Sequence, residues 1–279
     1  MAAYLQPRAL QDALSAMSEG HWTVLAGGTD HFPARVTHIP DEAILDVTAI
    51  PELRGISKSN DGIRIGATTT WTDLVEAVLP AACRGLTAAA REIGGVQIQN
   101  RGTIGGNICN ASPAADGIPA LLSLDAQVEL ASVSGHRTLP LSDFVIGNRK
   151  TMAKPDELLV AIHLPAAALT GPGAFLKLGA RKYLVISIVM VAGTLDLAED
   201  GTIAKARIAV GACSAAALRM TALETALVGL RPADASEHLN AGHFAGLSPI
   251  EDPRGDAAYR SDAAMTLTRR CLAHLAEAA

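Results

Sequence analysis

The chain has 279 residues, of which 49% are hydrophobic, 18% charged and 3% aromatic, and its formal net charge is −5. This length exceeds that of one average domain and accommodates two, each with a buried core. The acidic balance, without long runs of Lys or Arg, argues against a nucleic-acid-binding surface.

Targeting signals and metal motifs are missing from the sequence. The first residues lack the basic-then-apolar order of a secretory signal peptide. The longest apolar run, residues 183–195, is too short to cross a bilayer and predicts a buried strand or helix. The cysteines lie far apart, at Cys83, Cys109, Cys213 and Cys271, so no pair has the spacing of a zinc or iron–sulfur site. We expect a cytoplasmic protein without a transmembrane segment or a bound metal.

Hydrophobic periodicity predicts a mixture of short strands and helices in the first 165 residues. Thr70 or Thr72 is the expected N-cap of the second helix. The helices are predicted at 10–17, 72–78 and 86–93, and the strands at 23–26, 43–47, 62–67, 126–132 and 158–164.

Gly171-Pro172-Gly173 predicts a domain boundary, because both residue types interrupt regular structure. Beyond it we expect strand structure within 175–197, a solvated turn that includes Asp196, Glu199 and Asp200, and a strand at 206–211. Helices are predicted at 219–228 and 262–277.

Two glycine motifs carry the functional signal. One follows the strand at 23–26, with Gly27, Gly28 and a threonine, and the other, at 102–106, holds three glycines around Thr103 and Ile104. Glycine is favoured where φ is positive or where another group approaches the backbone closely. Loops of this kind expose N–H groups that bind phosphate oxygens without a cation.

Each glycine motif alone is equally consistent with a tight turn, but two in one chain favour a pyrophosphate ligand. Neither has the Gly-x-x-x-x-Gly-Lys-Ser/Thr pattern of a P-loop or the Gly-x-Gly-x-x-Gly spacing of a Rossmann turn. A nucleotide site here is therefore of another kind.

Three segments together carry a resemblance: Ala-Gly-Gly-Thr-Asp at 26–30, Gln-Asn-Arg-Gly-Thr-Ile-Gly-Gly-Asn-Ile at 99–108, and Ala-Ser-Pro-Ala-Ala-Asp at 111–116. They resemble the FAD-binding medium subunit of the molybdenum hydroxylases, the family of xanthine dehydrogenase and carbon monoxide dehydrogenase. Ile-Gly-Ala-Thr at 65–68, Asp-Glu-Leu-Leu at 156–159 and Lys-Leu-Gly-Ala-Arg-Lys at 177–182 also fit, so the match spans nearly the whole chain.

The resemblance implies an α+β fold. Residues 1–172 are expected to form an FAD-binding domain of the vanillyl-alcohol-oxidase-like (PCMH) type, with subdomains at about 1–55 and 56–172. A smaller α+β C-terminal domain is expected at 173–279.

The resemblance also implies a set of FAD-binding residues and no catalytic residue. The set comprises Ala26, Gly27, Gly28, Thr29, Asp30, His31, Ile93, Gly94, Gly102, Thr103, Gly105, Gly106, Asn107, Ile108, Asn110, Asp116, Leu158, Leu159 and Lys177.

Within this set, Thr29 and Thr103 are expected to add hydroxyl donors for the diphosphate. Because a carboxylate only accepts hydrogen bonds, Asp116 is expected to bind ribityl or ribose hydroxyls, or the N–H groups of its own loop. Lys177 is either a flavin contact that tunes the reduced cofactor or a solvated lysine beside a strand. His31 is either an FAD contact or a surface histidine.

The implied function is that of an electron-transfer subunit. The expected partners are a large subunit with the molybdopterin cofactor and a small subunit with [2Fe–2S] clusters, assembled as a dimer of heterotrimers. The acceptor remains open among NAD, quinone and oxygen. The alternatives are a self-contained FAD-dependent oxidoreductase of related fold and a scaffold without flavin. The Ala/Leu-rich segment after Gly173 is poor in paired polar groups, which disfavours the first, and the intact glycines disfavour the second.

Overall fold

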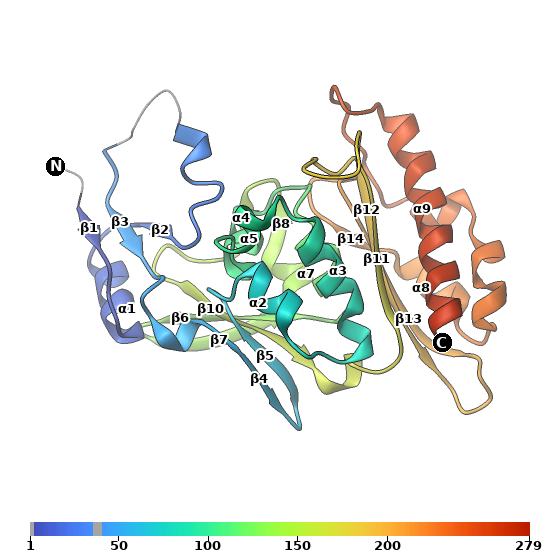
Figure 1. The fold of residues 1–279 in the computed structure, drawn as a ribbon, viewed down its shortest axis with the longest axis horizontal. Helices are drawn as coiled ribbons and strands as arrows, with labels where there is room; N and C mark the ends of the chain where they lie inside the picture. The colour runs from blue at the N-terminus through green and yellow to red at the C-terminus, as the bar shows by residue number, and fades with distance from the viewer. Residues whose placement is uncertain (1–2, 36–40) are drawn as a thin grey trace.

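The computed structural model describes residues 3–35 and 41–279. The three larger sheets follow one another along the long axis of an elongated molecule, with the N-terminal sheet at one end and the C-terminal helices at the other (Figure 1). The predicted α+β class is confirmed.

The N-terminal sheet is small and parallel, with strand order β1-β3-β2. A short core forms beside this sheet. There, one face of the helix at Leu10–Glu19 packs its Ala13, Leu14 and Met17 against Leu45. The predicted helix and strands of this region are confirmed. Their bounds are β1 Tyr4–Leu5, α1 Leu10–Glu19, β2 Thr23–Leu25 and β3 Ile44–Asp46.

The central sheet is antiparallel, with strand order β4-β5-β10-β6-β7. Its middle strand is an almost unbroken apolar run because both of its faces are covered. A separate two-stranded hairpin, formed by β8 and β9, comes between β7 and β10 in the sequence. The bounds are β4 Ile56–Ser59, β5 Gly62–Gly66, β6 Gln127–Ser132, β7 Gly135–Pro140, β8 Val145–Gly147, β9 Lys150–Thr151 and β10 Leu158–Pro165.

Helices fill the space between the central and C-terminal sheets (Figure 1). Thr70 caps the first of them in a capping box with Asp73, which confirms one of the two predicted caps. The bounds are α2 Trp71–Glu76, α3 Arg84–Glu92, α4 Val96–Gln99, α5 Ile104–Asn110, α6 Gly117–Leu122 and α7 Leu141–Phe144.

The C-terminal sheet is covered on both faces, with order β11-β12-β13-β14. In β12, Met190 and Ala192 face the central helices, whereas Val189 and Val191 face the C-terminal helices. The central core therefore extends across Gly173 into this sheet. The bounds are β11 Gly173–Leu178, β12 Val189–Leu197, β13 Ile203–Gly211, β14 Leu218–Arg219, α8 Thr221–Leu227 and α9 Ala257–Ala278.

The prediction of a buried element over 183–195 is wrong for its first half. The strand begins only at Val189, and Tyr183, Leu184 and Ile186 are exposed in the loop between β11 and β12. The hydrophobic pattern could not reveal this, because exposed apolar side chains are common on protein surfaces.

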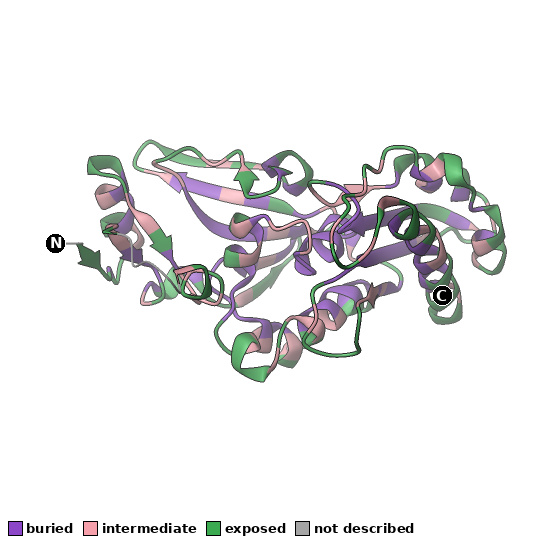
Figure 2. Ribbon diagram, turned by 90° about the horizontal axis from the view of Figure 1, so that it is seen from above, coloured by how far each residue is buried: buried purple, intermediate pink, exposed green. Residues whose placement is uncertain are grey.

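The inner strands of the two larger sheets and the inner sides of the helices are buried, while the edge strands β1, β4 and β7 and the outer helix faces are largely exposed (Figure 2). Among residues 3–35 and 41–279, no helix is long and apolar enough to cross a membrane.

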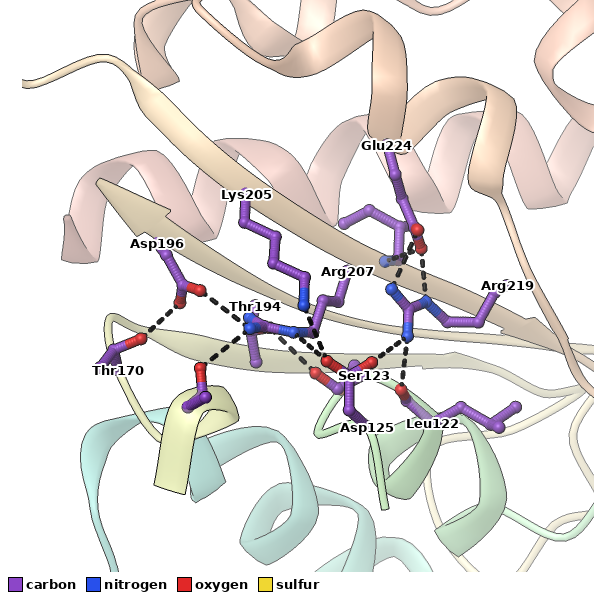
Figure 3. A network of polar contacts seen from close by, with 12 residues as sticks. Leu122, Ser123, Asp125, Thr170, Thr194, Asp196, Lys205, Arg207, Arg219 and Glu224 are labelled. Carbon is purple, nitrogen blue, oxygen red and sulfur yellow. Dashed lines mark hydrogen bonds and ion pairs between the residues drawn. The ribbon is translucent and has the colours of Figure 1, made fainter. Parts of the chain in front are cut away.

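A network of charged groups joins the segment after α6 to the C-terminal sheet (Figure 3). Asp125 accepts hydrogen bonds from Arg207 Nε at 2.7 Å, Arg219 Nη1 at 2.7 Å and Lys205 Nζ at 3.1 Å. Arg207 also pairs with Asp196 Oδ2 at 2.9 Å. The prediction that Asp196 belongs to a solvated turn is therefore wrong, because this carboxylate lies in β12 and compensates a buried guanidinium.

The ionic network should make the free energy of unfolding depend on pH. Burial by itself would raise the pKa of Asp125, but the hydrogen bonds from Arg219, Arg207 and Lys205 outweigh burial and lower it to about 2. A folded-state pKa below the unfolded value of about 3.9 gives stability that is present above pH 4 and lost as the pH falls toward 2. We expect Asp125→Asn to lower the free energy of unfolding at pH 5 to 7, and the difference from the unmodified chain to shrink toward pH 2.

Urea unfolding at several pH values measures this difference. The exposed Asp262 provides the control, since Asp262→Asn should leave the pH dependence unchanged. A difference that stays constant between pH 2 and pH 5 would contradict the role of the network.

Candidate functional site

The first glycine motif forms a turn directly after β2. Gly28 has φ of +73°, so the expectation of a positive φ is confirmed at this residue. Within the described residues, the N–H groups of Gly27, Gly28 and Thr29 donate to no acceptor of the chain. These donors are free to bind a ligand, as the sequence predicted for this motif.

The second glycine motif is a helix rather than a loop. Thr103 is the N-cap of α5, and its hydroxyl accepts a hydrogen bond from the N–H of Gly106 at 3.1 Å. The N–H groups of Gly105 and Asn107 donate to Ala67 O and Thr103 O at 2.9 and 3.0 Å. The prediction that this motif exposes a row of free N–H groups is therefore wrong, because the helix and its neighbour use them.

Close approach explains the glycines of the second motif. None of its three glycines has a positive φ. A Cβ on Gly105 would lie 2.7 Å from Ala67 O, so only glycine allows α5 to pack on the segment after β5.

The two motifs pack directly on each other. A Cβ on Gly27 would lie 2.0 Å from Arg101 O and 3.0 Å from the Cα of Gly102. The hydroxyl oxygen of Thr29 also lies beside Gly102, 3.4 Å from where its Cβ would be. Segments more than seventy residues apart in the sequence thus form one wall.

That wall borders a cavity of about 550 Å³, which is within the size range of small-molecule sites. The start of β10, the residue after α3 and the β8–β9 hairpin also contribute to its lining. The predicted residues that line it are Ala26, Gly27, Gly28, Thr29, Asp30, His31, Ile93, Gly102, Thr103, Gly105, Gly106, Asn107, Asn110, Leu158 and Leu159.

One polar atom at the cavity has no partner within the described chain. Asn107 Oδ1 is buried and accepts no hydrogen bond from it. Gly117 covers this oxygen closely, since a Cβ there would lie 2.9 Å away. A buried acceptor without a donor is costly, so a ligand that donates an N–H or O–H group fits this position.

The remaining predicted residues do not line the cavity. Ile108 belongs to the core, and Gly94, with φ of +59°, packs against Ile98. Asp116 and Lys177 form a buried ion pair, with Nζ 2.6 Å from Oδ2 and side chains only 6% and 7% exposed. The solvated-lysine interpretation is therefore wrong.

Asp116 binds side chains rather than the N–H groups of its own loop. Ser187 donates to its other oxygen at 2.5 Å, and Lys177 also donates to Glu92 O at 3.2 Å. Burial raises the pKa of Asp116, although Lys177 and the serine oppose this effect. Lys177 comes from β11 and Ser187 from the loop before β12, so this carboxylate connects the two parts of the chain.

Charged groups at the cavity rim were only partly predicted. His31 lines the cavity, and its pKa is lowered by burial and by Arg35, against the opposing influence of Glu42. Sequence reasoning missed Arg149, since no motif surrounds it. It also missed other lining residues whose positions only the fold reveals, such as Ala67, Thr68, Trp71, Ile98, Cys109 and Glu157.

The fold and cavity define a two-part α+β protein with a ligand site built from paired glycine motifs. Comparison with known families agrees with this class. Residues 1–167 match the FAD-binding domain of molybdopterin dehydrogenases, and residues 174–275 match the C-terminal domain of carbon monoxide dehydrogenase flavoproteins. The chain belongs to this family of flavoprotein subunits, which confirms the resemblance found in the sequence.

Individual relatives cover the chain almost completely. It is 32% identical to the putative xanthine dehydrogenase FAD-binding subunit of Escherichia coli, over 100% of this chain and 97% of the relative. It is 30% identical to the carbon monoxide dehydrogenase medium chain of Hydrogenophaga pseudoflava, over 96% and 95%. In reconstituted carbon monoxide dehydrogenase from Oligotropha carboxidovorans, a chain 27% identical superposes with a TM-score of 0.91, over 100% and 99%.

Proposed function

We propose that this chain is the FAD-carrying electron-transfer subunit of a heteromeric molybdenum hydroxylase, and that the cavity beside the two glycine motifs holds the FAD. One observation carries the site: Gly27 packs on Arg101 so closely that both motifs share one wall, at which Asn107 Oδ1 has no donor among the described residues. Membership of the flavoprotein family supports the choice of FAD as the ligand.

The residues have distinct binding roles in this proposal. The free N–H groups of the first motif donate to phosphate oxygens, and the hydroxyl of Thr29 adds a further donor. Asn107 Oδ1 accepts a hydrogen bond from the cofactor, and Leu158 and Leu159 supply an apolar wall. When bound, FAD supplies the capacity to accept and release electrons.

The partners follow from the same proposal. A large subunit with the molybdenum cofactor oxidises the substrate, and electrons reach this chain through [2Fe–2S] clusters on a small subunit. Relatives described as a medium chain and as a subunit of a dehydrogenase complex support a heteromeric assembly. We place the complex in the cytoplasm and the domain boundary near residue 172.

We expect the purified chain to contain stoichiometric, non-covalent FAD. The free N–H groups of the first motif suit phosphate oxygens, and membership of the FAD-binding family favours FAD over FMN. His31 and Cys109, whose residue types can bond covalently to flavins, line the cavity, and we expect neither of them to attach. Acid precipitation followed by chromatography of the supernatant measures the released flavin. Flavin that stays with the precipitate, or FMN in the supernatant, would contradict this expectation.

Measurements of substrate oxidation distinguish the proposed electron-transfer subunit from a self-contained flavoenzyme. Co-expression with its partner subunits should give a complex that contains molybdenum, iron and FAD and oxidises the substrate. The chain alone should transfer electrons to dyes without oxidising an organic substrate. Substrate oxidation by the isolated, metal-free chain would favour the self-contained enzyme.

A further inference from the structure

Among the described residues, the lining of the cavity includes one guanidinium that pairs with no carboxylate. Arg35 pairs with Glu42, Nε to Oε1 at 2.6 Å, and the lining carboxylate Glu157 pairs with Arg137 at the same distance. Arg149 also lines the cavity but forms no ion pair with any residue in the described ranges. A ligand that enters therefore meets a positive charge available for an anionic group.

The backbone at Arg149 is unusual for its residue type. This residue occupies the turn of the β8–β9 hairpin with φ of +53°, a conformation that suits glycine and costs other residues about 1 kcal/mol. A glycine would adopt this turn without strain. Strain of this kind often persists where the side chain has a function.

Two hydrogen bonds fix the arginine against α5. The backbone N–H of Arg149 donates to Ala111 O at 2.9 Å, and its guanidinium Nη1 donates to Asn110 Oδ1 at 2.8 Å. Asn110 also lines the cavity. The guanidinium has five N–H donors, so this single side-chain bond orients the group and leaves most of its donors free.

We propose that Arg149 binds the diphosphate of the cofactor. This inference rests on the proposed function, in which FAD occupies the cavity. The diphosphate carries the negative charge of FAD, and a planar guanidinium forms paired hydrogen bonds with phosphate oxygens. Because the N–H groups of Gly105 and Asn107 are occupied, backbone donors come from the first of the two motifs among the described residues, and Arg149 supplies the missing charge.

Flavin titrations of the full chain, freed of bound cofactor, test this assignment. Arg149→Gln should weaken FAD binding by about 10- to 100-fold, as expected for a charge-assisted hydrogen bond, and leave riboflavin binding unchanged because riboflavin has no phosphate. Added salt should weaken FAD binding by the unmodified chain more than binding by the variant.

Two further variants complete the experiment. Arg149→Gly keeps the left-handed backbone without strain, so it should fold normally and still lose FAD affinity. Lys150→Gln makes the same charge change at the next residue, whose side chain does not line the cavity, and should bind FAD normally.

The outcomes are distinct. FAD binding by Arg149→Gln at the unmodified affinity, or an equal loss of FAD and riboflavin binding, would overturn the diphosphate role. An unmodified chain that binds neither FAD nor riboflavin would instead refute the proposed function, and the inference would fall with it.

Discussion

Replacing Lys177 with Met is expected to destabilise the protein by about 3 to 5 kcal/mol, the range measured when one partner of a buried ion pair is removed. The side chains of Lys177 and Asp116 are almost completely buried. Met fills a similar volume but leaves the carboxylate without its cation. Chemical unfolding of the chain without cofactor measures the loss.

The pH dependence identifies the cause of this destabilisation. Without Lys177, the pKa of Asp116, already raised by burial, rises further. The folded variant then keeps a proton that the unfolded chain releases near pH 4, so the variant loses stability as the pH rises from 4 toward the folded-state pKa.

Two controls accompany Lys177→Met. Adding Asp116→Asn removes the buried charge and should restore part of the lost stability. Lys154→Met removes a lysine that is 68% exposed and 4.0 Å from Glu157, a carboxylate that keeps its closer partner Arg137, and should cost less than about 1 kcal/mol. A loss in Lys177→Met as small as that in Lys154→Met would show that the buried pair contributes little.

Gly106→Val is expected to remove FAD binding while the fold persists. Gly106 is exposed at the cavity, and an added Cβ would lie 2.9 Å from Thr103 Oγ1, so this N-cap hydroxyl must shift slightly to admit it. Its φ is not positive, so the backbone tolerates a side chain. A branched side chain that projects toward the ligand costs about 3 kcal/mol, or about a hundredfold in affinity.

Flavin content and circular dichroism of purified Gly106→Val measure the two effects separately. Gly246→Val is the matched control, because Gly246 is exposed and an added Cβ there meets no atom within 4 Å. If Gly106→Val retained the full flavin content, α5 would not border the cofactor.

Local features of the fold were predictable because their causes are local. The capping box at Thr70 and the amphipathic face of α1 are determined by neighbouring residues. The second glycine motif misled sequence reasoning because glycine disfavours helices. Its place inside α5 depends on Ala67, a residue nearly forty positions away, which tolerates only a small neighbour.

The part of the candidate site that consists of sequence motifs was predictable. Sequence reasoning identified the paired glycine motifs because their residue types are rare in this order. It could not pair Asp116 with Lys177, since these residues are 61 positions apart, one at the start of α6 and the other in β11. Arg149 has no motif, and its position at the cavity depends on the turn of a hairpin.

Ion pairs between residues before and after Gly171-Pro172 restrict how such chains recombine during evolution. Asp116 and Asp125 lie before this point, whereas Lys177, Arg207 and Arg219 lie after it. A hybrid formed by recombination at this point between two distant relatives inherits the acidic residues from one parent and the basic residues from the other. Where the parents place these charges differently, the hybrid buries an ion without its counterion. The two halves are therefore expected to be inherited together, although the junction itself resembles an ordinary linker.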